Sequence, residues 1–437
     1  MRTFFYFLSW LIFCSNAYAE LTITVTGNAT GDATGGGRGQ PIAIVPFAYA
    51  GSLPEDIAKI ISDDLYRSGY FNPMSRVSLP EKPSVPNQIN FPTWQAQNVP
   101  HLVIGRINGN AGQYTITFEL FDVRTQARLT GFSYKAPANA LRQVAHQISD
   151  VIYKTLTGTR GVFSTQIVYV TLQRQRGADI YNLYIADADG ANPRLMLRSS
   201  EPIFSPTWSP DASRIAYVTY DITWSPNRRK LKQMAVYIQD IRSGQRNRVA
   251  AWSGINSAPA WSADGSRLAL SLSKDGNPEI YVLDLRSGRL TRLTNNSAID
   301  TEPEWSPDGN SLVFTSDRSG NPQIYQIAAS GGREKRLTFR GNYNARARFS
   351  PDGTKLALLH GQSGYRIAIL NLSNQQMNIL TRTSLDESPS FAPNGSMIIY
   401  GTGSGLAAVS VDGGVQQRIS VNLNEEVREP AWSPFLN

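Results

Sequence analysis

Trp305-Ser306-Pro307-Asp308-Gly309 is the stretch that decides the fold, because variants of it recur along the C-terminal two-thirds of the chain. Proline at the second turn position fixes φ, and glycine at the fourth suits a type I turn. Each copy therefore predicts a tight turn between two strands. The other copies are Trp208-Ser-Pro-Asp211, Trp261-Ser-Ala-Asp-Gly265, Phe349-Ser-Pro-Asp-Gly353, Phe391-Ala-Pro-Asn-Gly395 and Trp432-Ser-Pro434.

The spacing of these copies points to a repeat architecture. Successive aromatic residues are 53, 44, 44, 42 and 41 positions apart, and each turn is followed by three further strand-like runs. Four short strands per period of about forty residues are typical of a β-propeller blade. Residues 168–197 have strand-like runs but no motif of their own, and the copy at Trp432 can supply it. We therefore expect a six-bladed β-propeller closed by the C-terminal strand, which leaves no open sheet edge.

One motif copy does not fit the period. Trp224-Ser-Pro-Asn227 follows Trp208 by only 16 residues, too few for a blade, and marks an insertion. The densest basic cluster of the chain lies there, at Arg228, Arg229, Lys230 and Lys232. We expect this cluster on a protruding loop.

The N-terminal residues resemble an export signal. Arg2 is followed by an apolar run and by Ala17-Tyr-Ala19, the small-x-small form that signal peptidase cleaves, so residues 1–19 are assigned to a signal peptide. The only cysteine, Cys14, lies inside this run, and the mature chain would contain no thiol. An exported protein without cysteine suits the Gram-negative periplasm. No later apolar stretch is long enough to span a bilayer.

Three further segments follow the signal peptide. Residues 20–38 combine a short alternating run with a glycine-rich tether, and they could donate a strand to another protein, fray, or fold back on their own domain. Residues 39–160 are expected to form a small α/β domain, with helices near residues 54–65 and 138–155. Residues 161–437 would form the propeller.

Composition and motifs argue against catalysis. There is no Gly-x-Ser-x-Gly element, and His101, His146 and His360 fall in three separate predicted elements with no zinc-binding motif. We expect no catalytic residues, no metal, no cofactor and structural roles for the histidines. The net charge of +8 is spread without a run of five basic residues, so nucleic-acid binding is not expected either.

The loops that precede each aromatic residue surround one mouth of the propeller channel. They are rich in acids and proline, as in Asp300-Thr-Glu-Pro303 and Asp386-Glu-Ser-Pro389. Two interpretations remain open. The acids could form an acidic rim for a partner, since propeller mouths commonly bind one, or they could only end strands and solvate loops.

Several stretches together resemble the TolB family of the Tol-Pal system: Gly39-Gln-Pro-Ile-Ala-Ile-Val-Pro-Phe47, Pro54-Glu-Asp-Ile57, Ser68-Gly-Tyr-Phe-Asn-Pro73, Phe314-Thr-Ser-Asp317 and Pro430-Ala-Trp-Ser-Pro434. The resemblance implies a non-enzymatic periplasmic scaffold that maintains outer-membrane integrity and constriction during division. It also implies two partners, the lipoprotein Pal at the propeller mouth and the C-terminal domain of TolA at the N-terminal strand. A monomer is expected.

Carried onto this chain, the resemblance implies two sets of contact residues. The Pal-binding set is Ile255, Asn256, Ala258, Pro259, Thr301, Glu302, Pro303, Asp386, Glu387 and Ser388. The TolA-binding set is Glu20, Leu21, Thr22, Ile23, Thr24 and Val25. The rival interpretation is a propeller enzyme or carbohydrate-binding module, with acids or aromatics that converge on a small ligand inside the channel.

Overall fold

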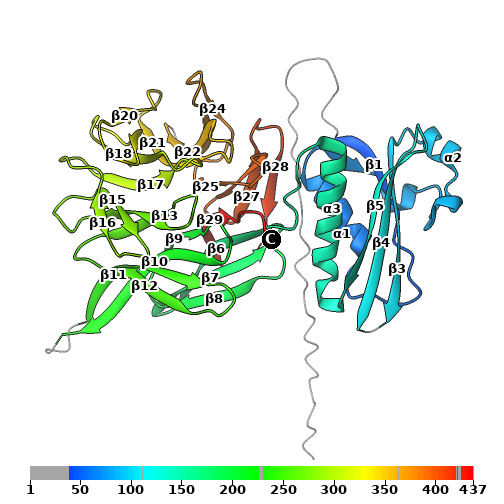
Figure 1. Ribbon diagram of the computed structural model, residues 1–437, viewed down its shortest axis with the longest axis horizontal. Helices are drawn as coiled ribbons and strands as arrows, with labels where there is room; N and C mark the ends of the chain where they lie inside the picture. The colour runs from blue at the N-terminus through cyan, green and yellow to red at the C-terminus, as the bar shows by residue number, and fades with distance from the viewer. Residues whose placement is uncertain are drawn as a thin grey trace, which may run out of the picture.

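The protein, as a computed structural model, is described for residues 39–110, 112–225, 230–362, 364–419, 421 and 425–436. It has two parts, an N-terminal α/β part and a ring of β-sheets, which Figure 1 shows side by side. The predicted signal peptide and the predicted TolA-binding segment lie outside the described residues. Of the helices that are described, none is both long and apolar enough to cross a bilayer.

A five-stranded sheet frames the N-terminal part. Its strands are Gln40–Ile44 (β1), Phe71–Pro73 (β2), His101–Asn110 (β3), Gln113–Asp122 (β4) and Arg128–Ala136 (β5). Their order is β2-β1-β3-β4-β5, in which β1 is parallel to both neighbours and the later pairs are antiparallel. The sequence did not predict the short edge strand β2.

Two helices cover the face of this sheet that looks toward the ring (Figure 1). They are Ile57–Arg67 (α1) and Leu141–Thr157 (α3), and a third short helix, Phe91–Ala96 (α2), lies away from the ring. Asp56 caps α1 by accepting a hydrogen bond from the backbone N–H of Lys59 at 3.0 Å. Apolar residues of α1 and α3 pack on the sheet in one buried core. α3 ends where Gly158 adopts φ +79°, a left-handed conformation that glycine takes at little cost.

The ring consists, within the described residues, of six four-stranded sheets. The first three blades are β29 (Glu426–Trp432), β6 (Gln166–Gln175), β7 (Ala178–Asp187) and β8 (Arg194–Ser199); β9 (Phe204–Trp208), β10 (Arg214–Trp224), β11 (Lys230–Asp240) and β12 (Arg246–Ala250); and β13 (Asn256–Trp261), β14 (Arg267–Leu272), β15 (Glu279–Asp284) and β16 (Leu290–Arg292). The predicted six-bladed propeller is confirmed.

The remaining three blades follow the same order from the inside of the ring to its outside. They are β17 (Asp300–Trp305), β18 (Ser311–Ser316), β19 (Gln323–Ala328) and β20 (Lys335–Arg336); β21 (Tyr343–Phe349), β22 (Lys355–Gly361), β23 (Tyr365–Asn371) and β24 (Met377–Ile379); and β25 (Glu387–Phe391), β26 (Met397–Gly401), β27 (Leu406–Ser410) and β28 (Gln416–Ile419). In each blade the innermost strand ends on the motif aromatic.

The recurring motif forms the predicted turn. In blade 4, the hydroxyl of Ser306 donates to Asp308 and accepts from the backbone N–H of Ser311 at 3.0 Å, while Gly309 adopts φ +70°. The same serine-aspartate pair recurs in blades 2, 3 and 5. These hydrogen bonds satisfy the backbone of each turn, so the repeated aspartates serve turns, as predicted.

The last strand closes the ring. β29 pairs antiparallel with β6, so the first blade takes its innermost strand from the C-terminal end of the chain. The indole N–H of Trp208 in the second blade donates to the carbonyl of Ala431 at 3.1 Å, which links that blade to the closing strand. Closure therefore joins residues more than 200 positions apart and leaves each inner strand between two neighbours.

The strands on both sides of the insertion at Trp224 are lengthened, and Lys230 and Lys232 lie in β11, not on a loop as the sequence predicted. β10 and β11 have eleven residues each and pair without interruption from Arg214 and Asp240 to Trp224 and Lys230. Lys232 lies within this ribbon and forms an ion pair with Glu201 at 2.6 Å. Arg228 and Arg229 lie outside the described residues.

The N-terminal part contacts the end of the propeller at which the motif turns lie. Asn394, in the motif turn of blade 6, donates to the carbonyl of Arg160 at 2.9 Å, and Asp189, between β7 and β8, contacts Arg142 of α3. The loops that enter the inner strands lie at the opposite ends of those strands. The predicted mouth therefore points away from the N-terminal part.

Candidate functional site

The mouth is built on a backbone irregularity that recurs in every blade. Three residues before each motif aromatic, the inner strand carries a residue with φ between 48° and 54°, and the strand register shifts there. These six residues, which we call the channel ring, are Ser205, Ala258, Glu302, Arg346, Ser388 and Glu429. Left-handed backbone is unfavourable for residues other than glycine, by about 1 kcal/mol each, and such strain tends to collect at functional sites.

The bulge has a local cause in the sequence. In five of the six blades the residue after the channel-ring residue is proline, as at Pro259 and Pro303. Proline has no N–H to donate to the neighbouring strand, and inside sheets it is tolerated mainly at bulges and edges. The Pro-x-aromatic pattern therefore places one side chain of each blade at the same level of the channel.

The channel-ring side chains form a connected network. The Arg346 guanidinium is 2.8 Å from Oε1 of Glu302 and 3.1 Å from Oε1 of Glu429, and it also bonds the hydroxyl of Ser388. The backbone N–H of Ser205 donates to Glu429 at 3.3 Å. Ala258 contributes only a methyl group. The floor of the mouth is thus tied together by side chains from four blades and by the backbone of a fifth, at Ser205.

A second level of the channel lies toward the motif turns. There, Arg348 pairs with Glu304 at 3.5 Å. Both line a cavity of about 410 Å³, together with motif prolines and aromatics and with Ser205, Ser388 and Glu429 of the channel ring. Burial raises the pKa of Glu304, and Arg348 opposes that shift. The charged groups of this level are therefore also paired with each other.

Buried polar side chains hold the mouth loops in place. Five residues before the aromatic stand Asn256, Asp300, Asn344 and Asp386, all essentially inaccessible to solvent. Asn256 accepts from the N–H of Trp252 at 2.9 Å, Asp300 binds Arg318 at 2.7 Å, and Asn344 donates to Gln323 at 2.9 Å. A buried polar group whose hydrogen bonds are all made holds its loop in one conformation. The loops of the mouth are therefore preorganised before a protein binds to them.

Apolar side chains face outward immediately before these buried residues. Ile255, Ile299 and Leu385 occupy equivalent positions in blades 3, 4 and 6 and are 40%, 48% and 66% exposed. Phe339, on the loop that enters blade 5, is 70% exposed. These four residues, the apolar arc, follow consecutive blades around the mouth.

The predicted acidic rim needs a correction. The acids are present, but Glu201 pairs with Lys232, Asp300 with Arg318, and Glu302 and Glu429 with Arg346. Glu201 and Asp300 each have a cation of their own, whereas Glu302 and Glu429 share the guanidinium of Arg346. Most of the rim acids are therefore bonded to cations, and exposed apolar side chains lie beside them.

The predicted Pal-binding residues take different positions in this arrangement. Ile255 is exposed, Thr301 and Glu302 are half-buried, and Ala258 and Ser388 belong to the channel ring. Asn256 and Asp386 are buried and bonded to their own loops, and Pro259 and Pro303 are buried at the bulges. Burial raises the pKa of Glu387, and nearby Glu429 raises it further.

Sequence reasoning missed three residues of the mouth, namely Ile299, Phe339 and Leu385. It placed Arg346 in a mouth loop, at Asn344-Ala-Arg346, but assigned it no contact. Counting backwards from each aromatic would have found Ile299 and Leu385, because both stand six positions before it, as Ile255 does. The predicted TolA-binding residues Glu20–Val25 lie outside the described residues.

The histidines have partners that the sequence did not reveal. His101 contacts Gln40 at 3.2 Å and His360 contacts Asn344 at 2.9 Å. His146 lies with Asp64 of α1 and Asp189 of the propeller, and possible ligand atoms of the three lie within 4.8 Å of one another. Two guanidinium groups, those of Arg67 and Arg142, already contact these carboxylates, so the cluster is an ion-pair network more than a cation site.

The same network controls the ionisation of Asp189. Burial alone would raise the pKa of this carboxyl, but Arg67, His146 and Arg142 together lower it to about 2. Basic groups of the N-terminal part therefore stabilise the ionised form of Asp189. The ion pairs connect the two parts of the molecule.

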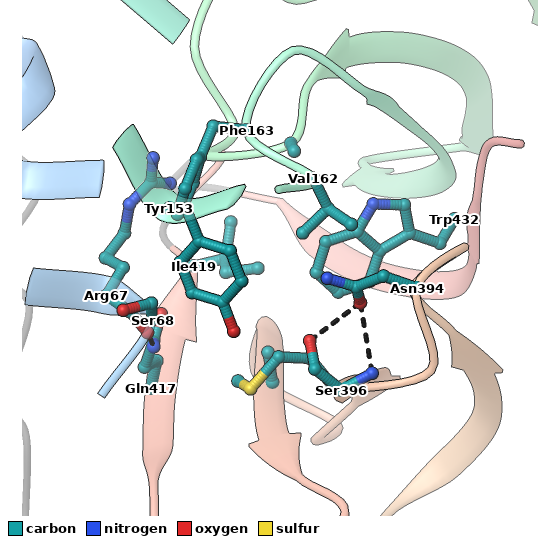
Figure 2. A pocket seen from close by; sticks show the side chains of 13 residues that line it. Arg67, Ser68, Tyr153, Val162, Phe163, Asn394, Ser396, Gln417, Ile419 and Trp432 are labelled. Atoms are coloured by element: carbon teal, nitrogen blue, oxygen red, sulfur yellow. Dashed lines mark hydrogen bonds between the residues drawn. The ribbon is translucent and has the colours of Figure 1, made fainter. Parts of the chain in front are cut away.

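A small cavity lies at the same boundary. Figure 2 shows Arg67, Ser68, Gln417 and Tyr153 on one side of it and Asn394, Ser396 and Trp432 on the other, with Val162 and Phe163 of the connecting segment above. Its volume of about 40 Å³ suits water molecules. Sites for small-molecule ligands usually have several hundred Å³, so this cavity is not a ligand pocket of that kind.

Comparison with known proteins agrees with this architecture over almost the whole chain. A family model described as the TolB amino-terminal domain matches residues 32–129, and one described as the TolB beta propeller domain matches residues 153–436. The Tol-Pal system protein TolB of Nitrosococcus oceani is 52% identical over 435 residues, which cover 98% of this chain and 96% of that protein. The one from Alcanivorax borkumensis is 53% identical over 433 residues, with 98% and 95% covered.

A solved structure shows the same arrangement. The crystal structure of TolB from Acinetobacter baumannii matches with a TM-score of 0.83 and 40% identity, and the match covers 95% of this chain and all of that one. Both domain models, the curated relatives and this structure agree, and the chain therefore belongs to the TolB family of Tol-Pal system proteins.

Proposed function

We propose that this Tol-Pal component is a non-enzymatic periplasmic scaffold that binds Pal at the propeller mouth and the C-terminal domain of TolA through residues 20–25. The division of labour follows the proposed domains: residues 20–38 as the TolA-binding segment, 39–160 as the α/β domain and 161–437 as the propeller. By joining these two partners, the protein would help to maintain the outer membrane and its constriction during division.

The proposed binding of Pal rests on one observation, the apolar arc on preorganised loops. Four large apolar side chains from consecutive blades are exposed beside buried, fully bonded polar residues. Apolar side chains at the centre of an interface supply most of its binding energy, and a rigid surface loses little entropy on association. This combination suits a folded protein domain better than a small polar ligand.

The rival, a propeller enzyme or sugar-binding module, requires free polar groups that converge in the channel. Arg346, Glu302 and Glu429 are bonded to one another, and Arg348 is bonded to Glu304. The support therefore favours a docking surface. Co-purification of untagged Pal with this protein from periplasm is the direct comparison, because the rival predicts no enrichment of Pal.

The experiment for the mouth uses two substitutions in the loop of residues 301–303. Thr301→Ile and Glu302→Lys should each abolish measurable binding of the soluble Pal domain in calorimetry, since both place unsuitable groups inside the interface. Arg286→Glu is the matched control, because Arg286 is exposed on the turn at the other end of blade 3 and should bind normally. Unchanged affinity of both mouth variants would refute this placement.

The proposed binding of TolA through the N-terminal segment is tested separately. A protein lacking residues 20–31 should lose TolA in a pull-down and keep Pal with unchanged affinity. If the folded deletion variant still binds TolA, the N-terminal segment is not the contact. If it loses both partners, the two binding functions are not separated in the way proposed.

A further inference from the structure

Arg346 has a position that no other residue of the channel ring shares. It is the single cation among the six, and its side chain reaches three of the other five, from blades 4, 6 and 1. Its backbone N–H also donates to Oε2 of Glu302 at 3.1 Å, and that same oxygen accepts from Thr315 at 2.9 Å. Blade 5 thus holds its neighbours on both sides through one side chain.

The charges around Arg346 are unbalanced in favour of the acids. Glu429, then Glu302 and Glu387, raise the pKa of the guanidinium, against the opposite effect of burial. The charged and titratable side chains that face it or its partners are Glu302, Tyr343, Glu387, Arg428 and Glu429. Without Arg346, carboxylates from three blades would repel one another in a partly dehydrated channel.

Two of the three loops proposed to bind Pal meet at this side chain. Glu302 lies in the loop of residues 301–303, and Ser388 lies in the loop of residues 386–388, with blade 5 between them. The separation and orientation of these loops therefore depend on Arg346. Its planar fork of donors can hold a carboxylate and a hydroxyl at fixed angles, which a single ammonium group cannot do.

We propose that Arg346 is a positioning residue for the protein partner, which sets the loops of blades 4 and 6 at the spacing that the partner requires. This inference rests on the proposed function of the mouth. Arg346 acts from the floor of the mouth and carries out its role through Glu302, Ser388 and Glu429.

The test compares two arginines on one strand. Arg346→Met should weaken binding of the soluble Pal domain by about tenfold, a usual size for coupling between interacting residues. Arg348→Met, two residues along β21 and in the second level of the channel, should change the affinity less than about twofold, because its partner Glu304 does not belong to the mouth loops. Circular dichroism and thermal unfolding confirm that both variants fold.

A pH profile separates positioning from a general loss of structure. In Arg346→Met, acidification protonates Glu387, whose pKa is raised by burial and by Glu429, and relieves its repulsion with the neighbouring carboxylates, so affinity should recover as the pH falls from 7.5 to 5. The double variant Arg346→Met with Glu429→Gln carries one carboxylate fewer and should recover part of the affinity already at pH 7.5. The wild-type protein should not gain affinity over this range.

The outcomes distinguish the inference from the proposed function. If Arg346→Met binds Pal normally while Thr301→Ile does not, the mouth is correct and the role of Arg346 is refuted. If Arg346→Met and Arg348→Met weaken binding equally and neither recovers at pH 5, Arg346 is only a structural residue and the inference fails. If neither Thr301→Ile nor Arg346→Met affects binding, the proposed function of the mouth itself fails.

Discussion

Nδ1 of His146 lies 2.7 Å from Oδ2 of Asp64, and the opposite ring nitrogen faces the carboxylate of Asp189 at 3.9 Å. Asp64 belongs to α1, whereas Asp189 belongs to the propeller, and all three side chains are buried. A histidine is therefore placed between one carboxylate of its own domain and one of the other. The protonation state of His146 therefore affects how strongly the two domains are held together.

Stability should depend on pH through His146. Burial lowers the pKa of this imidazole, but Asp64 and then Asp189 outweigh that effect, and the net shift is upward. A raised folded-state pKa means that the stabilisation is fully present below the unfolded value of about 6.5 and is lost as the pH rises through the folded value. We expect the Tm to fall on the alkaline side of neutrality, and His146→Gln to flatten this fall in calorimetric scans.

His360→Gln is the control for that experiment. Burial lowers the pKa of His360, and Arg340 and Arg366 lower it further, so His360 is neutral in the folded protein over the same alkaline range. This variant should keep the alkaline decrease of the wild type. Equal slopes for the wild type and His146→Gln would contradict the role of His146.

The ion pair between Arg142 and Asp189 should stabilise the domain boundary. Arg142→Met removes one of the three basic groups around the buried carboxylate of Asp189 and should lower the free energy of unfolding by about 3 kcal/mol. Lys59→Met breaks an exposed pair with Asp63 on α1 and should cost about 0.5 kcal/mol or less. Urea denaturation of both variants gives the comparison, and similar midpoints would mean that the boundary is held by other contacts.

Two tryptophans should differ sharply in their contribution to the ring. Trp208 is buried between the second blade and the closing strand and bonds the carbonyl of Ala431, so Trp208→Ala should cost about 3–5 kcal/mol. Trp224 is 66% exposed on the long hairpin, and Trp224→Ala should change stability by less than about 0.5 kcal/mol. Thermal unfolding checks both, and a large loss in Trp224→Ala would show that the hairpin packs on something else.

The bulge in β13 predicts that replacing two of its alanines with glycine changes stability in opposite directions. Ala258 has φ +48°, where glycine relieves strain, so Ala258→Gly should be neutral or stabilise by up to about 1 kcal/mol. Ala260 is buried two residues later, outside the positive-φ positions, and Ala260→Gly should destabilise by about 1 kcal/mol. Denaturant titration decides, and equal destabilisation of the two would mean that the bulge is not strained.

Much of the fold could be predicted because its signals are local. A proline and a glycine around an aspartate specify a turn within five residues, and the period between turns gives the number of blades. The amphipathic patterns of α1 and α3 located both helices to within a few residues. The strand β2 and the short helix α2 were missed, because three and six residues carry too little periodicity to be recognised.

The sequence by itself determined the six blades, their closure by the strand at Trp432, the family and the loops that surround the mouth. Only the tertiary structure decided what those loops present. Arg346 and Glu429 are 83 positions apart, and His146 and Asp64 are 82 apart, yet each pair is in contact. Turn formation and alternation depend on neighbouring residues. Whether a charge is paired depends on distances of a few ångströms between residues that are far apart in the sequence. Most of the rim acids therefore proved to be bonded to cations, beside an arc of exposed apolar side chains.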